Sequence, residues 1–122
     1  MTEIQNPIIP GMAPDPSIIR VGEDYYIATS TFHWNPGIQI FHSKDLVNWD
    51  LLTHVLQHGE VNLRGTNTPA GIWAPHLSYD EKTACFGWHT VICRIWPVVS
   101  LILNPTPCMP KILLVLGQNQ SI

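Results

Sequence analysis

Prolines and glycines recur throughout the chain before residue 70, and no stretch between them keeps the 3.6-residue apolar period of an amphipathic helix. Between these breaks lie short runs rich in β-branched and aromatic residues, with Gly22-Glu23 as a tight turn between the first two. An all-β fold is therefore predicted, and four-stranded units that repeat along a chain are typical of β-propeller blades. The expected strands are 17–21, 24–30, 37–43 and 49–54 in one antiparallel sheet, followed by 72–79 in a second series.

An aspartate lies between two prolines in the segment Pro14-Asp15-Pro16-Ser17. Proline fixes its own φ near about −65° and disfavours helical geometry in the residue before it, so the sequence predicts an extended Asp15 with little backbone freedom. A stiff loop therefore holds a carboxylate in place. The same residues are common turn formers, and an ordinary turn is the alternative interpretation of this segment taken alone.

Size and charge exclude several classes of partner. The chain has 122 residues, within the range of roughly 100–150 residues for one domain. Its formal net charge is −3 and only 12% of its residues are charged, so no basic face for nucleic acid is expected. The N-terminus lacks a basic region followed by an apolar run, which favours a cytoplasmic location. The apolar runs 98–103 and 112–116 are shorter than the roughly 20 residues of a membrane-spanning helix, so no membrane partner is expected.

The cysteines and histidines do not predict a metal site or a disulfide framework. Three cysteines is an odd number without paired close spacing, which predicts free thiols. His54 and His58 are four residues apart, but the local sequence predicts strand and loop, and no third ligand lies at useful spacing. We expect no metal and no cofactor.

The composition changes abruptly after Lys82. All nine Asp and Glu residues lie at or before residue 81, whereas the three cysteines and four of the eleven prolines lie beyond it. A shift of reading frame near codon 83 would produce such a change. We therefore divide the chain into residues 1–82 and a tail, 83–122, that is expected to be frame-shifted or disordered. A native set of strands in the tail is disfavoured by the three prolines between residues 105 and 110.

Several short segments occur in the order and spacing of one known family and together cover about residues 4–82. This region closely resembles the N-terminal part of glycoside hydrolase family 43, the group of β-xylosidases and α-L-arabinofuranosidases. The tail 83–122 matches nothing in the family pattern. The matching segments are Asn6-Pro7, Pro14 to Ile18, Asp24 to Phe32, Pro36 to Ile40, His42 to Trp49 and Gly71 to Pro75.

The resemblance implies a five-bladed β-propeller, of which this chain holds the first blade and the start of the second. It also implies an inverting mechanism with a pocket at one end of the propeller axis. Asp15 matches the family's general base, and Phe32 and Trp73 match aromatic residues that line the sugar pocket; a structural position is the alternative for each aromatic. The family's glutamate acid and the aspartate that tunes its pKa belong to later blades, and no residue after Glu81 can replace them.

The implied function is that of a β-xylosidase-type glycoside hydrolase that cleaves O-glycosyl bonds of xylo-oligosaccharides with inversion in xylan metabolism. Its partner is a small oligosaccharide, either a xylo-oligosaccharide or an arabinosyl side chain, and the motifs leave xylosidase and arabinofuranosidase activity both open. Because two catalytic carboxyl groups are missing, we expect this chain alone to be inactive. Two other classes stay open: a non-catalytic carbohydrate-binding fragment that uses Phe32 and Trp73, and a structural β-domain without sugar binding.

Overall fold

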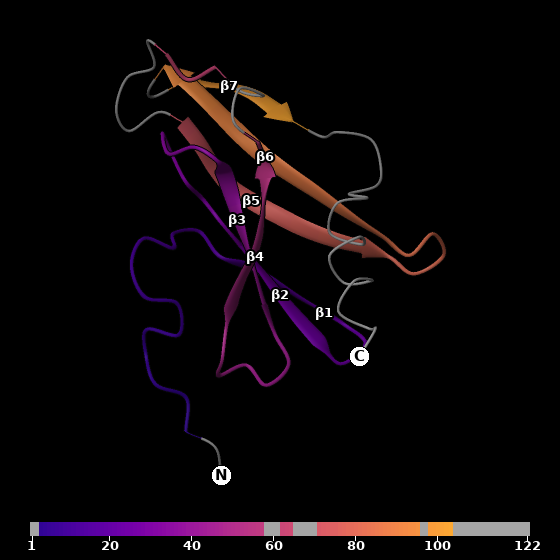
Figure 1. Cartoon of the computed structure of the whole chain (residues 1–122). Helices are drawn as coiled ribbons and strands as arrows, with labels where there is room; N and C mark the ends of the chain where they lie inside the picture. Colours follow the sequence, from indigo (N-terminus) through magenta and orange to yellow (C-terminus); the bar gives the residue numbers. More distant parts are fainter. Residues whose placement is uncertain (1–2, 58–61, 65–70, 96–97, 104–122) are drawn as a thin grey trace.

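The computed structural model describes residues 3–57, 62–64, 71–95 and 98–103, and these residues form two antiparallel β-sheets (Figure 1). The first sheet has four strands in chain order, and the second has three. No helix in the described part of the chain is long and apolar enough to cross a membrane. The all-β class expected from the sequence is confirmed.

The first sheet is built from the short β-rich runs of the N-terminal part. Gly22, with a φ of 61°, turns the chain between the first two strands, and each strand pairs with the next one along the chain. The observed strands agree with the predicted ones to within two residues at every end. They are β1 (Ser17–Val21), β2 (Asp24–Thr29), β3 (Gly37–Ser43) and β4 (Asp50–Leu56).

The second sheet begins with the segment that contains Trp73 and continues beyond residue 82. Its first two strands pair from Gly71 opposite Cys93 to Asp80 opposite Cys85. Alternate residues of the middle strand, from Phe86 to Ile92, are buried, as expected for a strand with one face against a core. The strands are β5 (Gly71–Asp80), β6 (Cys85–Ile95) and β7 (Val98–Leu103).

Strands β6 and β7 lie within residues 83–122, the segment predicted to be a frame-shifted or disordered tail. The origin of residues 83–122 in a shifted reading frame stays a prediction, and the prolines between 105 and 110 lie outside the described residues. Cys85 is disulfide-bonded, so the expectation of free thiols is wrong for this residue. Spacing along the chain does not show which distant cysteines folding brings within bonding distance.

The two sheets share one hydrophobic core. Ile38 and Ile72, from different sheets, are completely buried within it. Aromatic rings extend the core, since the centroid of Phe86 lies 4.9 Å from that of Tyr26 and 4.9 Å from that of Tyr79. Figure 1 shows β5 and β6 running across the first sheet, and β5 contacts β1, β2 and β3. This packing fixes which loops meet at the ends of the two sheets.

A side chain closes the turn between β3 and β4. The Asp45 carboxylate accepts hydrogen bonds from the backbone N–H groups of Val47 at 2.9 Å and Asn48 at 2.8 Å, and from the Asn48 side chain at 2.7 Å. In the same turn, Nε1 of Trp49 donates to the carbonyl of Leu46 at 3.1 Å. The Asp45 side chain thereby accepts hydrogen bonds that a backbone carbonyl accepts in an ordinary turn, as in other Asx turns.

The Asp45 turn predicts a loss of stability in acid. Hydrogen bonds from Asn48 and Val47 hold the pKa of Asp45 well below its ordinary value of 3.8. A folded-state pKa that is lowered contributes stability above the unfolded pKa, and this stability is lost as pH falls through the folded pKa. We expect the midpoint of urea unfolding to decrease between about pH 5 and about pH 2, and to decrease less in Asp45→Asn. If the urea midpoint of Asp45→Asn decreased with pH as much as that of the unsubstituted chain, the stabilising role of the Asp45 carboxylate would be contradicted.

Candidate active site

Asp15 lies in an exposed position in the loop before β1. Its φ is 52°, in the left-handed region, so the extended geometry predicted from Pro16 is wrong. Ser30, immediately after β2, holds the loop: its Oγ donates to Oδ2 of Asp15 at 2.7 Å, and its N–H donates to the carbonyl of Pro14 at 2.9 Å. Tertiary hydrogen bonds therefore override the local preference of the residue before a proline.

Phe32 and Trp73 come from different sheets and lie next to each other. The N–H of Phe32 donates to the carbonyl of Ile72 at 3.0 Å, and the N–H of Ile72 donates back to the carbonyl of Phe32 at 2.9 Å. The rings of Phe32 and Trp73 meet edge to face, with centroids 6.4 Å apart and planes at 84°. Both side chains are partly exposed. The two aromatic residues predicted for a sugar pocket are thus joined by a backbone bridge between the sheets.

Ser30 connects Asp15 to the strand that carries Trp73. The backbone N–H of Ala74 donates to Oγ of Ser30 at 2.7 Å, and the same hydroxyl donates to Asp15. Ser30 is completely buried, and hydrogen bonds of a buried hydroxyl are electrostatically stronger than those in water. The candidate residues Asp15, Phe32 and Trp73 therefore belong to one junction, which we call the blade junction, between the ends of β1, β2 and β5.

The backbone of the blade junction is strained. Three of its non-glycine residues have a positive φ: Asp15 at 52°, Phe32 at 49° and Ala74 at 41°. Conformations of this kind cost about 1–3 kcal/mol each, and they persist only where the surrounding structure enforces them. Together with an exposed carboxylate and an aromatic pair, this strain is typical of a functional site.

Gly71 allows the two sheets to approach at the blade junction. Its φ is 145°, and a Cβ at this position would lie 2.5 Å from both the carbonyl carbon and the carbonyl oxygen of Phe32. Trp73 in this segment was predicted from the sequence, whereas the role of Gly71 and the residue Ser30 were not. A glycine at the start of a strand is a signal for close backbone approach. Ser30 has no comparable local signal.

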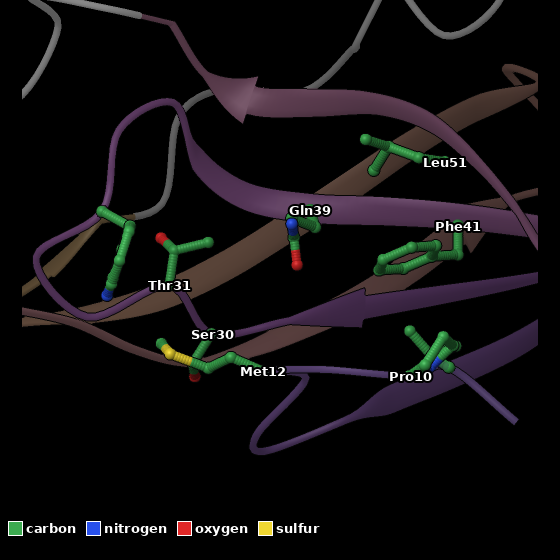
Figure 2. A pocket seen from close by; sticks show the side chains of 9 residues that line it. Pro10, Met12, Ser30, Thr31, Gln39, Phe41 and Leu51 are labelled. Atoms are coloured by element: carbon green, nitrogen blue, oxygen red, sulfur yellow. The ribbon is translucent and has the colours of Figure 1, made fainter. Parts of the chain in front are cut away.

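A cavity of about 340 Å³ lies beside the blade junction (Figure 2). Pro10 and Met12 line it from the N-terminal segment, and Phe41 and Leu51 line it from β3 and β4. Ser30 also lines it, next to the hydrogen bond to Asp15, but Asp15, Phe32 and Trp73 do not. The cavity has the size of a small-ligand pocket and is separate from the aromatic pair.

His54 and His58, the two histidines spaced four residues apart, are only partly described by the structure. His54 lies in β4, where burial lowers its pKa, and His58 lies outside the described residues. Within the described ranges there is no group of three or more His, Cys, Asp or Glu side chains placed to hold a metal ion.

The blade junction can supply one half of an acid–base pair. An exposed carboxylate can accept a proton from a nearby water molecule. Inverting glycoside hydrolysis also needs a second carboxyl group about 6.5–9.5 Å from the first. The chain contains no Asp or Glu after Glu81, so the later carboxyl groups implied by the resemblance have no counterpart in it.

Known proteins with a similar sequence are glycosidases. The family model described as Glycosyl hydrolases family 43 matches residues 4–84. "Xylosidase/arabinosidase 43B" of Humicola insolens is 58% identical over 83 residues, which are 67% of this chain and 15% of the relative. "Beta-xylosidase" of Bacillus subtilis strain 168 is 56% identical over 80 residues, which are 65% of this chain and 15% of the relative. The chain thus spans about 15% of the length of these curated relatives.

Solved structures of similar fold come from the same family. The xylan β-1,4-xylosidase of Bacillus halodurans C-125 superposes with a TM-score of 0.72 at 47% identity, over 78% of this chain and 18% of that one. The Bacteroides ovatus protein "Xyloglucan PUL GH43B" superposes with a TM-score of 0.73 at 42% identity, over 83% of this chain and 20% of that one. These neighbours are five-bladed β-propellers, so the predicted first blade and start of a second are confirmed. The chain belongs to glycosyl hydrolase family 43 and contains the N-terminal portion of its propeller.

Proposed function

We propose that this chain supplies the general base and part of the sugar-binding surface of an inverting glycoside hydrolase of the β-xylosidase type. The observation that carries the proposal is the blade junction, where Ser30 holds Asp15 at the ends of the strands that bring Phe32 and Trp73 together. The names of the relatives, xylosidases and an arabinofuranosidase, support the substrate class, which is a xylo-oligosaccharide or an arabinosyl side chain. No cofactor is part of the proposed mechanism.

Asp15 acts as the general base in this mechanism. Its Oδ2 accepts the hydrogen bond from Ser30, and its Oδ1 has no hydrogen-bond partner among the described residues. Oδ1 is therefore available to accept a proton from the attacking water. Water attacks the anomeric carbon on the face opposite the leaving oxygen, and a second carboxyl group protonates that oxygen. Because this second group is absent from the chain, the chain alone does not complete the reaction.

Phe32 and Trp73 provide the apolar part of the sugar-binding surface. The C–H groups of a pyranose ring form an apolar face that packs on aromatic rings. The edge-to-face arrangement at 84° leaves the two rings at nearly right angles, so they border a corner rather than a flat platform. A corner of this kind suits a single terminal sugar better than a long flat chain.

A chimeric enzyme tests the proposed function. Residues 4–84 replace the matching segment of the Bacillus subtilis beta-xylosidase, which supplies the remaining blades. We expect the chimera to release nitrophenol from an aryl β-xyloside, because the blade junction supplies the missing general base. The controls are this chain alone and the relative without its N-terminal segment, both of which are expected to be inactive. A folded chimera without activity contradicts the proposal.

The same chimera distinguishes the two substrate classes. Rates on aryl β-xyloside and aryl α-L-arabinofuranoside are compared with those of the parent relative. A change in their ratio assigns part of the specificity to residues 4–84, and an unchanged ratio assigns it to the later blades. The non-catalytic alternative predicts that this chain alone binds xylo-oligosaccharides in calorimetry, whereas the chimera has no activity.

A further inference from the structure

We propose that Ser30 is a positioning residue that orients the Asp15 carboxylate and couples it to the second blade. The proposal rests on the general-base function proposed for Asp15. Ser30 acts through Asp15 and is not itself assigned a contact with substrate.

The two hydrogen bonds of the Ser30 hydroxyl have fixed directions. The N–H of Ala74 can only donate, so Oγ of Ser30 accepts this bond at 2.7 Å. A serine hydroxyl has one hydrogen to donate, and it meets Oδ2 of Asp15 at 2.7 Å. Because Ser30 is completely buried, each of the two bonds polarises and strengthens the other. The hydroxyl hydrogen is thus directed at the carboxylate.

Ser30 holds the Asp15 loop at two points. Its N–H donates to the carbonyl of Pro14 at 2.9 Å, next to the hydroxyl contact with the Asp15 side chain. One attachment would leave the carboxylate free to rotate, whereas the two together restrict both the loop and the side chain. This restriction accounts for a positive φ at Asp15 and leaves Oδ1 without a hydrogen-bond partner among the described residues.

The acceptor role of Ser30 links the general base to the docking of the second sheet. Ala74 belongs to β5, and Ile72 in the same strand forms the backbone bridge to Phe32. If β5 moves away, Oγ of Ser30 loses the Ala74 N–H and its hydrogen is free to turn to another acceptor. The orientation of Asp15 is therefore set only when the second blade is in place.

Hydrogen exchange in the full chain tests this link. In Ser30→Ala, the Ala74 amide loses its acceptor, and we expect it to exchange about tenfold faster. The carbon NMR resonance of the Asp15 carboxylate should change as well, because its donor is removed. The Ile72 amide, which donates to a backbone carbonyl, keeps its exchange rate and serves as the internal reference. Unchanged exchange at Ala74 overturns the proposal.

Ser43→Ala is the matched control, because Ser43 is also buried but contacts the Asp45 turn. It should leave the Ala74 amide and the Asp15 resonance unchanged.

A second pair, Ser30→Thr and Ser30→Val, covers the case in which Ser30→Ala does not fold. Threonine and valine have nearly the same shape, so any crowding is shared and the hydroxyl is the main difference. If the Ala74 amide exchanges faster in Ser30→Val than in Ser30→Thr, the proposal is supported. Equal exchange rates in the two variants overturn it.

Kinetics of the chimera distinguish positioning from a general loss of structure. We expect Ser30→Ala to lower kcat by about 10–100-fold with little change in KM, because the misplaced base affects the transition state. Ser30→Thr should restore more activity than Ser30→Val. An active chimera whose kcat is the same in Ser30→Ala overturns the proposal. A chimera that is inactive without any substitution contradicts the proposed function. In that case, the exchange rate of the Ala74 amide in the full chain still tests whether Ser30 links Asp15 to β5.

Discussion

Asp15→Asn in the chimera should lower kcat by about 10²–10⁴-fold, the usual contribution of a general base. Asparagine has nearly the shape of aspartate, and its carbonyl oxygen can still accept the hydrogen bond that Ser30 donates at 2.7 Å. The loop should therefore stay in place while the amide is unable to take a proton from water. Because the lost interaction develops in the transition state, KM should change little. Initial rates of nitrophenol release at saturating substrate measure the effect.

Asp80→Asn is the control for this experiment. Asp80 is an exposed carboxylate at the end of β5, seven residues from Trp73 and so about 23 Å away along the strand. Its substitution should leave kcat unchanged. Full activity in Asp15→Asn would assign the base to another group and contradict the proposed mechanism. Equal losses in both variants would point to a loss of folded protein, which circular dichroism of the two chimeras separates from a catalytic effect.

The positions of Asp15, Phe32 and Trp73 were accessible from sequence because each lies in a short segment with its own pattern. Prolines mark the first, whereas Phe32 and Trp73 were predicted from the match of their segments to the family motifs. The structure brings all three to the blade junction. Their catalytic and binding roles stay predictions.

The link from Ser30 to the second sheet could not be predicted, because Ala74 is distant in the chain. Ser30 lies 15 residues from Asp15 and 44 residues from Ala74, and the contact with Ala74 needs the second sheet docked on the first. The positive φ of Asp15 was missed as well, since local rules for a residue before proline favour extended backbone. Sequence patterns describe neighbours along the chain, whereas this hydrogen-bond network joins three elements.

Strand β6 was missed for a different reason. The family motifs end near residue 82, where the composition also changes, but the residues that follow contain a simple alternation. Phe86, Trp88, Thr90 and Ile92 occupy alternate positions and are buried, which is the period expected of a half-buried strand. This element could therefore have been predicted from its local pattern of burial, without the family motifs.

Gly71→Ala should destabilise the chain more than any surface substitution. A Cβ at this position would lie 2.5 Å from the backbone carbon and oxygen of Phe32, and backbone cannot move aside as a flexible side chain can. The φ of 145° is also rarely adopted by alanine. With about 1–3 kcal/mol for the strained backbone and a similar amount for the forced displacement, we expect the free energy of unfolding to fall by about 2–6 kcal/mol. Urea denaturation followed by tryptophan fluorescence measures this change.

Gly22→Ala separates the effect of the clash from that of the backbone angle. Gly22 also has a positive φ, 61°, but a Cβ there would meet nothing within 4 Å. Alanine at this turn should therefore cost only about 1–2 kcal/mol, the usual penalty of the left-handed region. Gly71→Ala should in addition abolish the protection of the Ile72 amide, since the Phe32–Ile72 bridge cannot form when the strands are pushed apart. Equal losses of stability in the two variants, with the Ile72 amide still protected, would show that the close approach at Gly71 does not hold the blades together.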